Sequence, residues 1–350
     1  MNNLNIAIVG YGGMGRHHGV DLIAREPHFT LVGAYDTDPV RNQLAQTDGV
    51  TAYDSFSSLL ADDTIDVVLI VTPNDSHYHL AIQALQAGKH VFCEKPAMMS
   101  VAELDQVLAV AQTTGKTFMV HQNRRWDPDF LIIKRLYDHP DNPAHIGEVF
   151  QIESRVHGAN GIPGDWRHQK AQGGGMVLDW GVHLYDQLLW LINSPIVNME
   201  SHLSYVLQNQ VEDGFTTRLY FENGLQALVE VGTTNYIKLP RWYVKGVSGT
   251  AVIHDWDNTG SVIRCQDGTL PQHKNLVPIK AGAGFTKTMA PPAETDTQKL
   301  ALPEPWEQPV SIYQNFYEVV VHGAAPVVCN QSVRQVMLLM EEVFRVAQTQ

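Results

Sequence analysis

The sequence predicts an α/β protein with a doubly wound parallel sheet in its first third, followed by a second domain built on an antiparallel sheet. Short apolar runs alternate with helical stretches over residues 1–122, a pattern typical of parallel sheets. A glycine cluster, Gly10–Gly15, separates the first strand from the first helix. After Gln122 the strands alternate apolar and polar residues at longer spacings, as expected for an antiparallel sheet with one covered face.

Residues 1–122 contain strands that are short, apolar and rich in β-branched side chains, as in buried strands. Asp38 can cap a helix that has Pro39 at its first position, and Gly88 and Gly115 can end two later helices. The predicted strands are Leu4–Val9, Thr30–Tyr35, Asp66–Val71, His90–Cys93 and Thr117–His121, and the predicted helices are Gly15–Arg25, Asp38–Gln46, Ser57–Leu60, Ser76–Ala87 and Val101–Thr114.

Residues 123–350 are predicted to form the second domain. Asp138–Gly147 is a polar loop, and Gln272–Pro309 is rich in proline, glycine, threonine and lysine. We expect the latter to be a long loop that serves as a lid or a subunit contact. The predicted strands are Val149–His157, Val197–Leu207, Thr216–Phe221, Gln226–Val231 and Ala251–Asp255, and the predicted helices are Pro128–Tyr137, Val177–Leu191, Val310–His322 and Ser332–Ala347.

The composition excludes several classes of protein. A formal net charge of −13 provides no general phosphate-binding surface, so nucleic acid is not an expected partner. Cys93, Cys265 and Cys329 are far apart and form no CxxC pair, which argues against a zinc knuckle or a disulfide framework and suits a reducing compartment. We find neither a secretory leader pattern nor an apolar run of about 18 residues. We therefore expect a cytoplasmic protein without a membrane partner.

Gly10-Tyr11-Gly12-Gly13-Met14-Gly15 fits the G-x-G-x-x-G pattern between a strand and a helix. The first glycine allows a tight turn, the second lets the backbone approach a pyrophosphate, and the third lets helix and strand pack closely. The amides at the helix N-terminus would then face the phosphate charge. A structural glycine turn is the alternative, but the flanking strand and helix favour a dinucleotide site.

Asp36 lies 21 residues after Gly15, at the end of the second predicted strand. A carboxylate there can accept hydrogen bonds from the adenosine ribose and would repel a 2′-phosphate, which favours NAD over NADP. Arg41 is close enough in sequence to favour a 2′-phosphate instead. NADP is therefore kept as the alternative cofactor.

Glu94-Lys95-Pro96 follows directly on the fourth predicted strand. Ligands of open α/β sheets bind beyond the carboxyl ends of the strands, so Lys95 is predicted to lie beside the nicotinamide end of the cofactor. A lysine at that place can stabilise the alkoxide of a substrate hydroxyl. The alternative is a surface ion pair between Glu94 and a neighbour.

Asp179 and His183 follow the triple glycine Gly173–Gly175 and stand four residues apart, on one face of the predicted helix. Asp186 lies three residues further along that face. Histidine titrates near neutral pH and suits a general base, while a carboxylate can orient the substrate. The alternative is a helix-terminal acid followed by a core histidine.

Three further clusters lie where a cofactor or a substrate could contact them. Thr72-Pro73-Asn74 follows the third strand, with His77 shortly after it. The other two are Arg124-Arg125-Trp126, after the fifth strand, and Asp165-Trp166-Arg167, before the triple glycine. Each could equally be an ordinary loop or cap.

Metal and hydrolase chemistry are not predicted. The neighbouring histidines His17 and His18, and the pair His77 and His79, do not place two imidazoles on one helix face with a third ligand. No G-x-S-x-G elbow appears either.

In this order, these motifs resemble the Gfo/Idh/MocA family of oxidoreductases, named for glucose–fructose oxidoreductase and inositol dehydrogenase. The resemblance covers most of the chain and rests on Gly10–Gly15, Thr72-Pro73-Asn74, Glu94-Lys95-Pro96, the triple glycine and Asp179-x-x-x-His183. It implies a Rossmann domain over residues 1–122 and, over residues 123–350, a substrate-binding and oligomerisation α/β domain with a large, open, mainly antiparallel sheet. Homodimers or homotetramers are implied as well.

The resemblance also implies roles for individual residues. Lys95 would position and polarise the reacting hydroxyl, His183 would be the general acid and base, and Asp179 would orient the substrate. Substrate contacts are expected from Lys95, Arg124, Trp166, Asp179 and His183. Cofactor contacts are expected from Gly10, Tyr11, Gly12, Gly13, Met14, Gly15, Asp36, Thr72, Pro73, Asn74, His77, Glu94, Lys95, Gln122, Trp166 and Arg167.

We therefore expect an NAD-dependent dehydrogenase that oxidises a secondary or anomeric hydroxyl of a sugar, an inositol or a glycoside. Two alternatives stay open. One is a glycosidase that retains NAD and acts by transient oxidation and elimination. The other is a non-catalytic NAD-binding regulatory subunit, although the presence of Lys95, Asp179 and His183 argues against a loss of catalysis.

Overall fold

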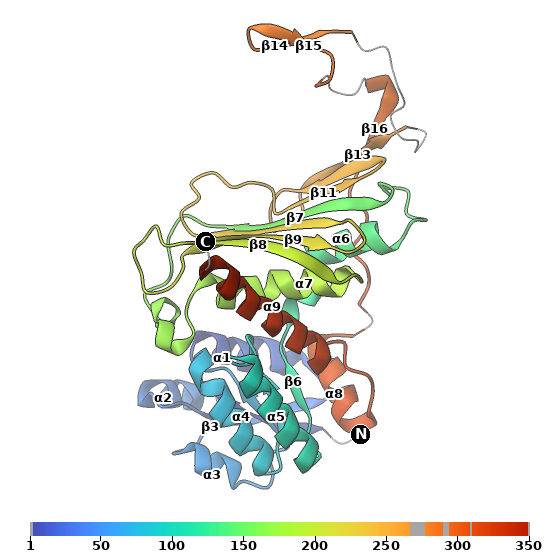
Figure 1. The fold of residues 1–350 in the computed structure, drawn as a ribbon. Coiled ribbons are helices and arrows are strands. Elements are labelled where there is room, and N and C mark those ends of the chain that lie inside the picture. The colour runs from blue at the N-terminus through green and yellow to red at the C-terminus, as the bar shows by residue number, and fades with distance from the viewer. Residues whose placement is uncertain (1–2, 267–276, 290–293, 309, 349–350) are drawn as a thin grey trace.

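The computed structural model describes residues 3–266, 277–289, 294–308 and 310–348. Figure 1 shows two α/β domains, one containing the N-terminus and one built on a large sheet. Within the described residues, no helix has the length and apolar character needed to cross a membrane.

The first domain is built on a six-stranded sheet with the order β3-β2-β1-β4-β5-β6, and each neighbouring pair is parallel. This confirms the predicted doubly wound sheet, although the sequence analysis missed the short strand β3. The strands are β1 (Leu4–Val9), β2 (Phe29–Tyr35), β3 (Thr51–Ala52), β4 (Val67–Ile70), β5 (His90–Cys93) and β6 (Phe118–Val120).

The helices of the first domain begin and end close to the predicted residues. Asp38 accepts a hydrogen bond from the Val40 amide, and Gly115 ends α5 in the left-handed conformation at φ +67°. The helices are α2 (Pro39–Thr47), α3 (Phe56–Leu60), η3 (Asn74–Ser76), α4 (His77–Gln86) and α5 (Val101–Thr114).

The helix predicted over Gly15–Arg25 is not a single α-helix. It consists of a short α-helical turn, a π-helical turn and a 3₁₀ turn, namely α1 (Gly13–His17), η1 (His18–Leu22) and η2 (Ile23–Arg25). The π-helical turn includes His18, whose buried imidazole is held by side chains of other elements. Tertiary contacts of this kind override local helix preference.

The second domain is built on an eight-stranded sheet with the order β16-β13-β12-β11-β7-β10-β9-β8. All neighbouring strands are antiparallel except β7 and β10. The strands are β7 (Val149–His157), β8 (Ile196–Ser204), β9 (Gly214–Phe221), β10 (Gln226–Gly232), β11 (Trp242–Gly246), β12 (Gly249–Ile253), β13 (Gly260–Cys265) and β16 (Thr297–Leu300).

Parts of this domain differ from the prediction. The sequence analysis missed β11 and β13. The region expected to be one long loop, Gln272–Pro309, contains β16, η8 (Glu294–Asp296) and a hairpin formed by β14 (Ile279–Ala281) and β15 (Gly284–Thr286). Residues 272–276, 290–293 and 309 of that predicted loop lie outside the described residues.

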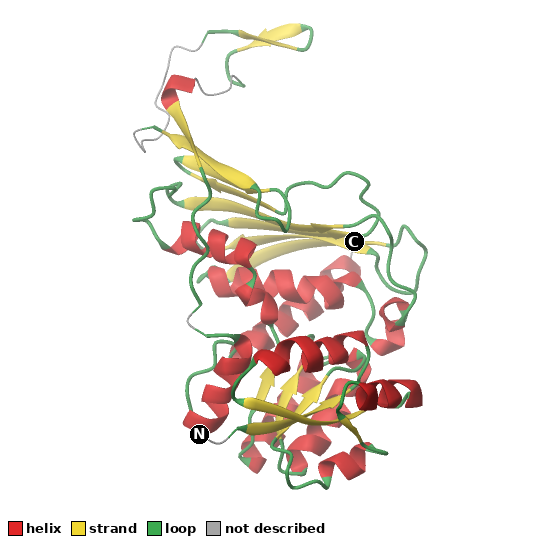
Figure 2. Cartoon of the chain, turned by 180° about the vertical axis from the view of Figure 1, so that it is seen from behind, coloured by secondary structure: helices red, strands yellow, loops and turns green. Residues whose placement is uncertain are grey.

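Helices α6 (Pro128–Asp138), α7 (Val182–Leu191) and α9 (Asn330–Gln348) cover the face of this sheet that is turned toward the first domain (Figures 1 and 2). The region predicted as one helix over Val177–Leu191 starts with a π-helical turn before the α-helix. The helical elements are η4 (Asn123–Trp126), α6 (Pro128–Asp138), η5 (Trp166–His168), η6 (Lys170–Gln172), η7 (Val177–Gly181), α7 (Val182–Leu191), α8 (Ile312–His322) and α9 (Asn330–Gln348).

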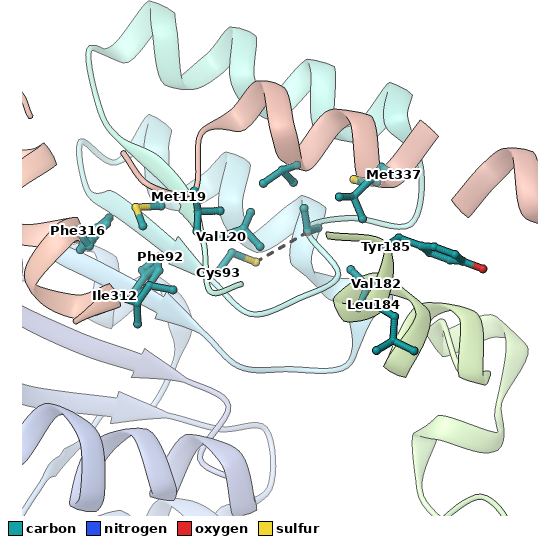
Figure 3. Close-up of a cluster of buried hydrophobic side chains, with 14 of the residues drawn as sticks. Phe92, Cys93, Met119, Val120, Val182, Leu184, Tyr185, Ile312, Phe316 and Met337 are labelled. Carbon is teal, nitrogen blue, oxygen red and sulfur yellow. Dashed lines mark hydrogen bonds between the residues drawn. The ribbon is translucent and has the colours of Figure 1, made fainter. Parts of the chain in front are cut away.

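The core is continuous between the domains (Figure 3). Helix α8 returns to the first domain, where Phe316 stacks on Phe92 at a ring-centroid distance of 4.6 Å. Helix α9 lies against α5 and β6 on one side and against α7 and β8 on the other. The end of the chain therefore joins the two domains.

Candidate active site

The glycine motif forms a cradle that only glycine can build. Gly10 has φ +93°, and a Cβ atom there would lie 2.4 Å from the Val71 carbonyl oxygen. A Cβ atom on Gly15 would lie 1.9 Å from the Gly10 carbonyl oxygen, whereas one on Gly13 would meet open space. The loop is therefore packed closely against β4 and the start of α1 but open at Gly13, as a pyrophosphate site requires.

Asp36 lies beside this cradle, at the end of β2. Its Oδ2 accepts a hydrogen bond from the Tyr11 amide at 2.7 Å, and its Oδ1 accepts one from the Asp38 amide at 2.9 Å. The Arg41 guanidinium is half-exposed, 3.5 Å from Asp36 Oδ2. The buried carboxylate has lone pairs left for ribose hydroxyls, and Arg41 adds a cation, so these residues fit an adenine dinucleotide.

Lys95 joins the two motifs that the sequence analysis selected separately. It follows β5, and its Nζ donates to the Asp179 carbonyl oxygen at 2.9 Å and to Asp179 Oδ1 at 3.0 Å. Arg167 Nε lies 3.5 Å from the same carboxylate oxygen. Burial opposes the ionisation of Asp179, but Lys95 and Arg167 outweigh this effect and lower its pKa.

His183 lies on α7 near this ion pair and is only 4% exposed. Its Nδ1 has no hydrogen-bond partner among the described residues. Burial, followed by the charges of Lys95 and Arg124, holds the pKa of His183 well below its usual value. The imidazole is therefore neutral near pH 7 and can accept a proton.

Behind Lys95, Glu94 is the centre of a buried network that the sequence analysis missed. Glu94 Oε1 accepts hydrogen bonds from His18 Nε2 at 2.9 Å and from His121 Nδ1 at 2.8 Å, and Oε2 accepts one from the Lys95 amide at 3.1 Å. Tyr313 of α8 lies 2.5 Å from His18 Nδ1. Although burial raises the pKa of Glu94, the two imidazoles outweigh burial and lower it well below its usual value.

This network was missed because its members come from distant parts of the chain. His18 is in a helix after the glycine loop, whereas His121 and Glu94 end adjacent parallel strands. Only the pairing of β5 with β6 would have indicated the contact. The three side chains could also offer ligand atoms to a metal ion, since these atoms lie within 4.8 Å of one another, but the network is already complete with hydrogen bonds.

Residues of the Thr72-Pro73-Asn74 cluster tie neighbouring loops together. Asn74 Nδ2 donates to the Gly173 carbonyl at 2.8 Å, which links β4 to the triple glycine. The ring nitrogens of His77 lie 3.0 Å from the carbonyl oxygens of Thr72 and Pro96. His77 is thus engaged with the backbone on both sides, and its predicted contact with the cofactor stays a prediction.

The arginine cluster after β6 divides between the site and the core. Arg124 lies over the Trp180 ring at 4.4 Å and over the Trp256 ring at 5.1 Å. Trp180 directly follows Asp179 in the chain. Arg125 is buried and pairs with Asp186 at 2.6 Å. Asp186 therefore holds Arg125 in the core.

The remaining predicted residues differ in exposure. Gln122 is buried and its Oε1 has no partner among the described residues. Arg167 lies over the Trp166 ring at 4.7 Å. Met14 is half-exposed, whereas the Tyr11 side chain is buried and its hydroxyl donates to Asp48. Only the Tyr11 backbone therefore faces the Asp36 side of the dinucleotide site.

Glu212 is a second acid that sequence analysis missed. Its Oε1 accepts a hydrogen bond from the Val177 amide at 2.9 Å, at the start of the helix that carries Asp179. A Cβ atom on Gly175 would lie 2.4 Å from this oxygen, so the third glycine of the triplet makes room for the carboxyl group. Burial raises the pKa of Glu212 to about 7.

Two family models match the chain. Residues 4–122 match a model described as "Oxidoreductase family, NAD-binding Rossmann fold". Residues 143–252 match the GFO/IDH/MocA C-terminal domain. The order of the two matches is the order of the domains in the structure.

Three similar proteins illustrate the range of relatives. An NAD-binding protein from Listeria innocua of known crystal structure has a TM-score of 0.95 and 51% identity, over 100% of this chain and 98% of that one. The uncharacterized oxidoreductase YdgJ of Escherichia coli is 34% identical over 56% of this chain and 55% of its own. The chain thus spans about half the length of that curated relative. The scyllo-inositol 2-dehydrogenase (NADP(+)) IolW of Bacillus subtilis is 25% identical over 75% of this chain and 72% of its own.

Proposed function

Because the chain belongs to the GFO/IDH/MocA family of NAD-binding oxidoreductases, we propose that it oxidises a secondary or anomeric hydroxyl of a sugar, an inositol or a glycoside. The contact of Lys95 with Asp179 carries this proposal. It brings the strand end beside the dinucleotide cradle against the helix that carries His183. The site therefore combines a cofactor cradle, a cation and a neutral imidazole.

The cofactor would be held by the glycine cradle and by Asp36. A bound nicotinamide would accept the hydride, a hydrogen with two electrons, that leaves the hydroxyl-bearing carbon. We favour NAD because the Asp36 carboxylate lies where it would repel a 2′-phosphate. The relative IolW is named for NADP(+), and Arg41 beside Asp36 supports NADP as the second choice.

The remaining chemistry is assigned to three side chains. Lys95 holds the substrate hydroxyl and stabilises negative charge on its oxygen. His183 accepts the hydroxyl proton, because its lowered pKa leaves the imidazole neutral. Asp179 keeps the Lys95 ammonium in place and offers its carboxylate to a further substrate hydroxyl.

The test is reduction of NAD and NADP across a panel of inositols, aldoses and glycosides. Lys95→Ala and His183→Ala should each lower kcat/KM at least about 100-fold, the usual contribution of a positioned acid or base, while NAD still binds by fluorescence titration. Lys299→Ala, on the edge strand β16, is the matched control and should keep full activity. Turnover that survives in both site variants would refute the assignment, and hydrolysis of aryl glycosides without net cofactor reduction would favour the glycosidase.

We also propose a homodimer or homotetramer in the cytoplasm. The face of the large sheet away from α6, α7 and α9 is uncovered in the part of the chain that the structure describes (Figure 2), and the three cysteines are unpaired. Light scattering of the purified protein tests the oligomer.

A further inference from the structure

The segment Val277–Met289, here called the arm, extends from the second domain into solvent (Figure 1). It contains the hairpin of β14 and β15, which pair with each other. Val277, Phe285 and Met289 are 78%, 77% and 77% exposed. A lone two-stranded hairpin is marginally stable in water, and clustered exposed apolar side chains mark a binding surface. The arm is therefore expected to pack against another protein surface.

The arm leaves the large sheet at the end opposite to the candidate active site. Strand β13 begins at Gly260, which pairs with Ile253 of β12, and Ile253 in turn pairs with Trp242 of β11. Trp256, which follows β12 at this end, contacts Trp180 and Arg124 of the site. The arm follows the other end of β13, at Cys265.

The end of the sheet beside the site carries its own exposed apolar side chains, here called the rim. Tyr236, Ile237, Leu239 and Trp256 are 90%, 85%, 50% and 41% exposed. Lys238 lies beside Ile237, and its Nζ donates a hydrogen bond to Asp255 Oδ2 at 2.8 Å. This contact joins the two loops that form the rim. Trp256 places the rim directly beside the Arg124 side chain of the site.

We propose that the arm of one chain covers the rim of a second copy of this chain. The arm and the rim lie at opposite ends of one sheet, so a two-fold pair with antiparallel sheets brings each arm to the partner's rim, and both contacts form at once. The charges are complementary: the arm carries Lys280 and Lys287 and no acid, whereas in the rim Asp255 is paired with Lys238 and Asp257 leaves one negative charge over. Each chain then completes the wall of the other's substrate site.

Cross-linking tests this contact without reference to any substrate. Phe285→Cys chains and Ile237→Cys chains, in a Cys265→Ser/Cys329→Ser background, are mixed and oxidised. We expect a disulfide-linked dimer of one chain of each kind. Phe285→Cys mixed with Val321→Cys, an exposed position on α8, should stay unlinked. A link that forms only within a chain carrying both Phe285→Cys and Ile237→Cys would overturn the proposal.

Solution mass gives a second readout. Phe285→Asp/Met289→Asp and Ile237→Asp should each weaken the dimer at least about tenfold, equivalent to 1.4 kcal/mol, while Val321→Asp should not. A wild-type chain that is monomeric at micromolar concentration, or variants that leave the dimer unchanged, would contradict the arm-to-rim contact. Capture of another protein by the arm would also refute a second copy as the occupant.

Subunit mixing tests the functional consequence, and this readout alone rests on the proposed function. The arm variant Phe285→Asp/Met289→Asp should have a raised KM, and Lys95→Ala should be inactive. After mixing and exchange, the arm-variant site receives an intact arm from the Lys95→Ala chain, so activity should recover. If the cross-link forms but the chain reduces no cofactor with any substrate, the proposed function fails while the arm contact stands.

Discussion

The two domains hold their sides of the candidate active site in different ways. On the first-domain side, both Glu94 oxygens are engaged by groups from other elements, and His18 is held in turn by Tyr313. On the second-domain side, His183 Nδ1 has no partner within the described residues, and the Arg124 guanidinium contacts the rings of Trp180 and Trp256. The first domain thus fixes the backbone at Lys95, whose ammonium is held by Asp179, while the second domain also keeps polar atoms available to a ligand.

The largest expected effect tests how strongly the first-domain side is fixed. Glu94→Ala would leave His18 and His121 without their shared acceptor in a buried place, so the free energy of unfolding should fall by about 4 kcal/mol. Urea denaturation measures this loss. Glu342→Ala, which removes an exposed partner of Arg345, is the control and should change stability little. If Glu94→Ala lowers the free energy of unfolding as little as Glu342→Ala does, the first-domain side of the site is not held by this network.

The next effect concerns Glu212 and pH on the second-domain side. Its pKa is raised to about 7 from 4.5, so the folded state favours the protonated acid, and this stability is lost as pH rises through 7. Glu212→Gln stays neutral and should gain stability over the wild type by on the order of 3 kcal/mol between pH 5 and pH 8. Thermal unfolding at several pH values measures the difference, with Glu222→Gln, an exposed glutamate, as a control without such a trend.

A smaller effect is expected for Trp256, which packs on Arg124 from the rim. Trp256→Ala removes a cation–π contact with Arg124, worth about 1 kcal/mol, and a second one with the buried Arg241. Because Arg124 lies at the site, KM for the substrate should rise about fivefold while kcat changes less. Steady-state kinetics give the split between KM and kcat. A loss confined to kcat would show that the second-domain side positions the reacting groups as tightly as the first.

The smallest effect is expected at the exposed Arg41. Arg41→Ala should weaken the binding of NADP more than the binding of NAD, because the lost cation would face the 2′-phosphate. The difference should be only about threefold, because solvent screens a half-exposed cation. Fluorescence titration of both reduced cofactors gives the ratio of their dissociation constants. If the variant weakens the binding of NAD more than the binding of NADP, Arg41 contributes to the binding of NAD, the cofactor that Asp36 favours.

Local sequence patterns predicted the first domain well because its strands β1, β4, β5 and β6 are almost wholly buried and its motifs follow strands in chain order. Gly10–Gly15, Asp36 and Lys95 each follow a strand, so topology alone places them at one edge of the sheet. The parallel sheet and the mainly antiparallel second sheet are confirmed. The proposed boundary at residue 122 and the individual cofactor contacts stay predictions.

The missed features depend on contacts between distant residues. His18, Glu94, His121 and Tyr313 come from four elements, and no local pattern joins them. Trp256 and Glu212 lie in loops whose place is set by strand pairing. Strands β11 and β13 were also missed; each has a glycine at one end, and the charged residues Lys245 and Arg264 interrupt their apolar pattern.

The return of α8 to the first domain has a consequence for biosynthesis. Tyr313 and Phe316 complete the buried interior around His18 and Phe92, yet they are translated after nearly all of the second domain. The ribosome must therefore synthesise most of the polypeptide before the N-terminal domain can complete its core. Until then the nascent chain exposes the apolar surface beneath α8, a state in which chaperones normally engage emerging proteins.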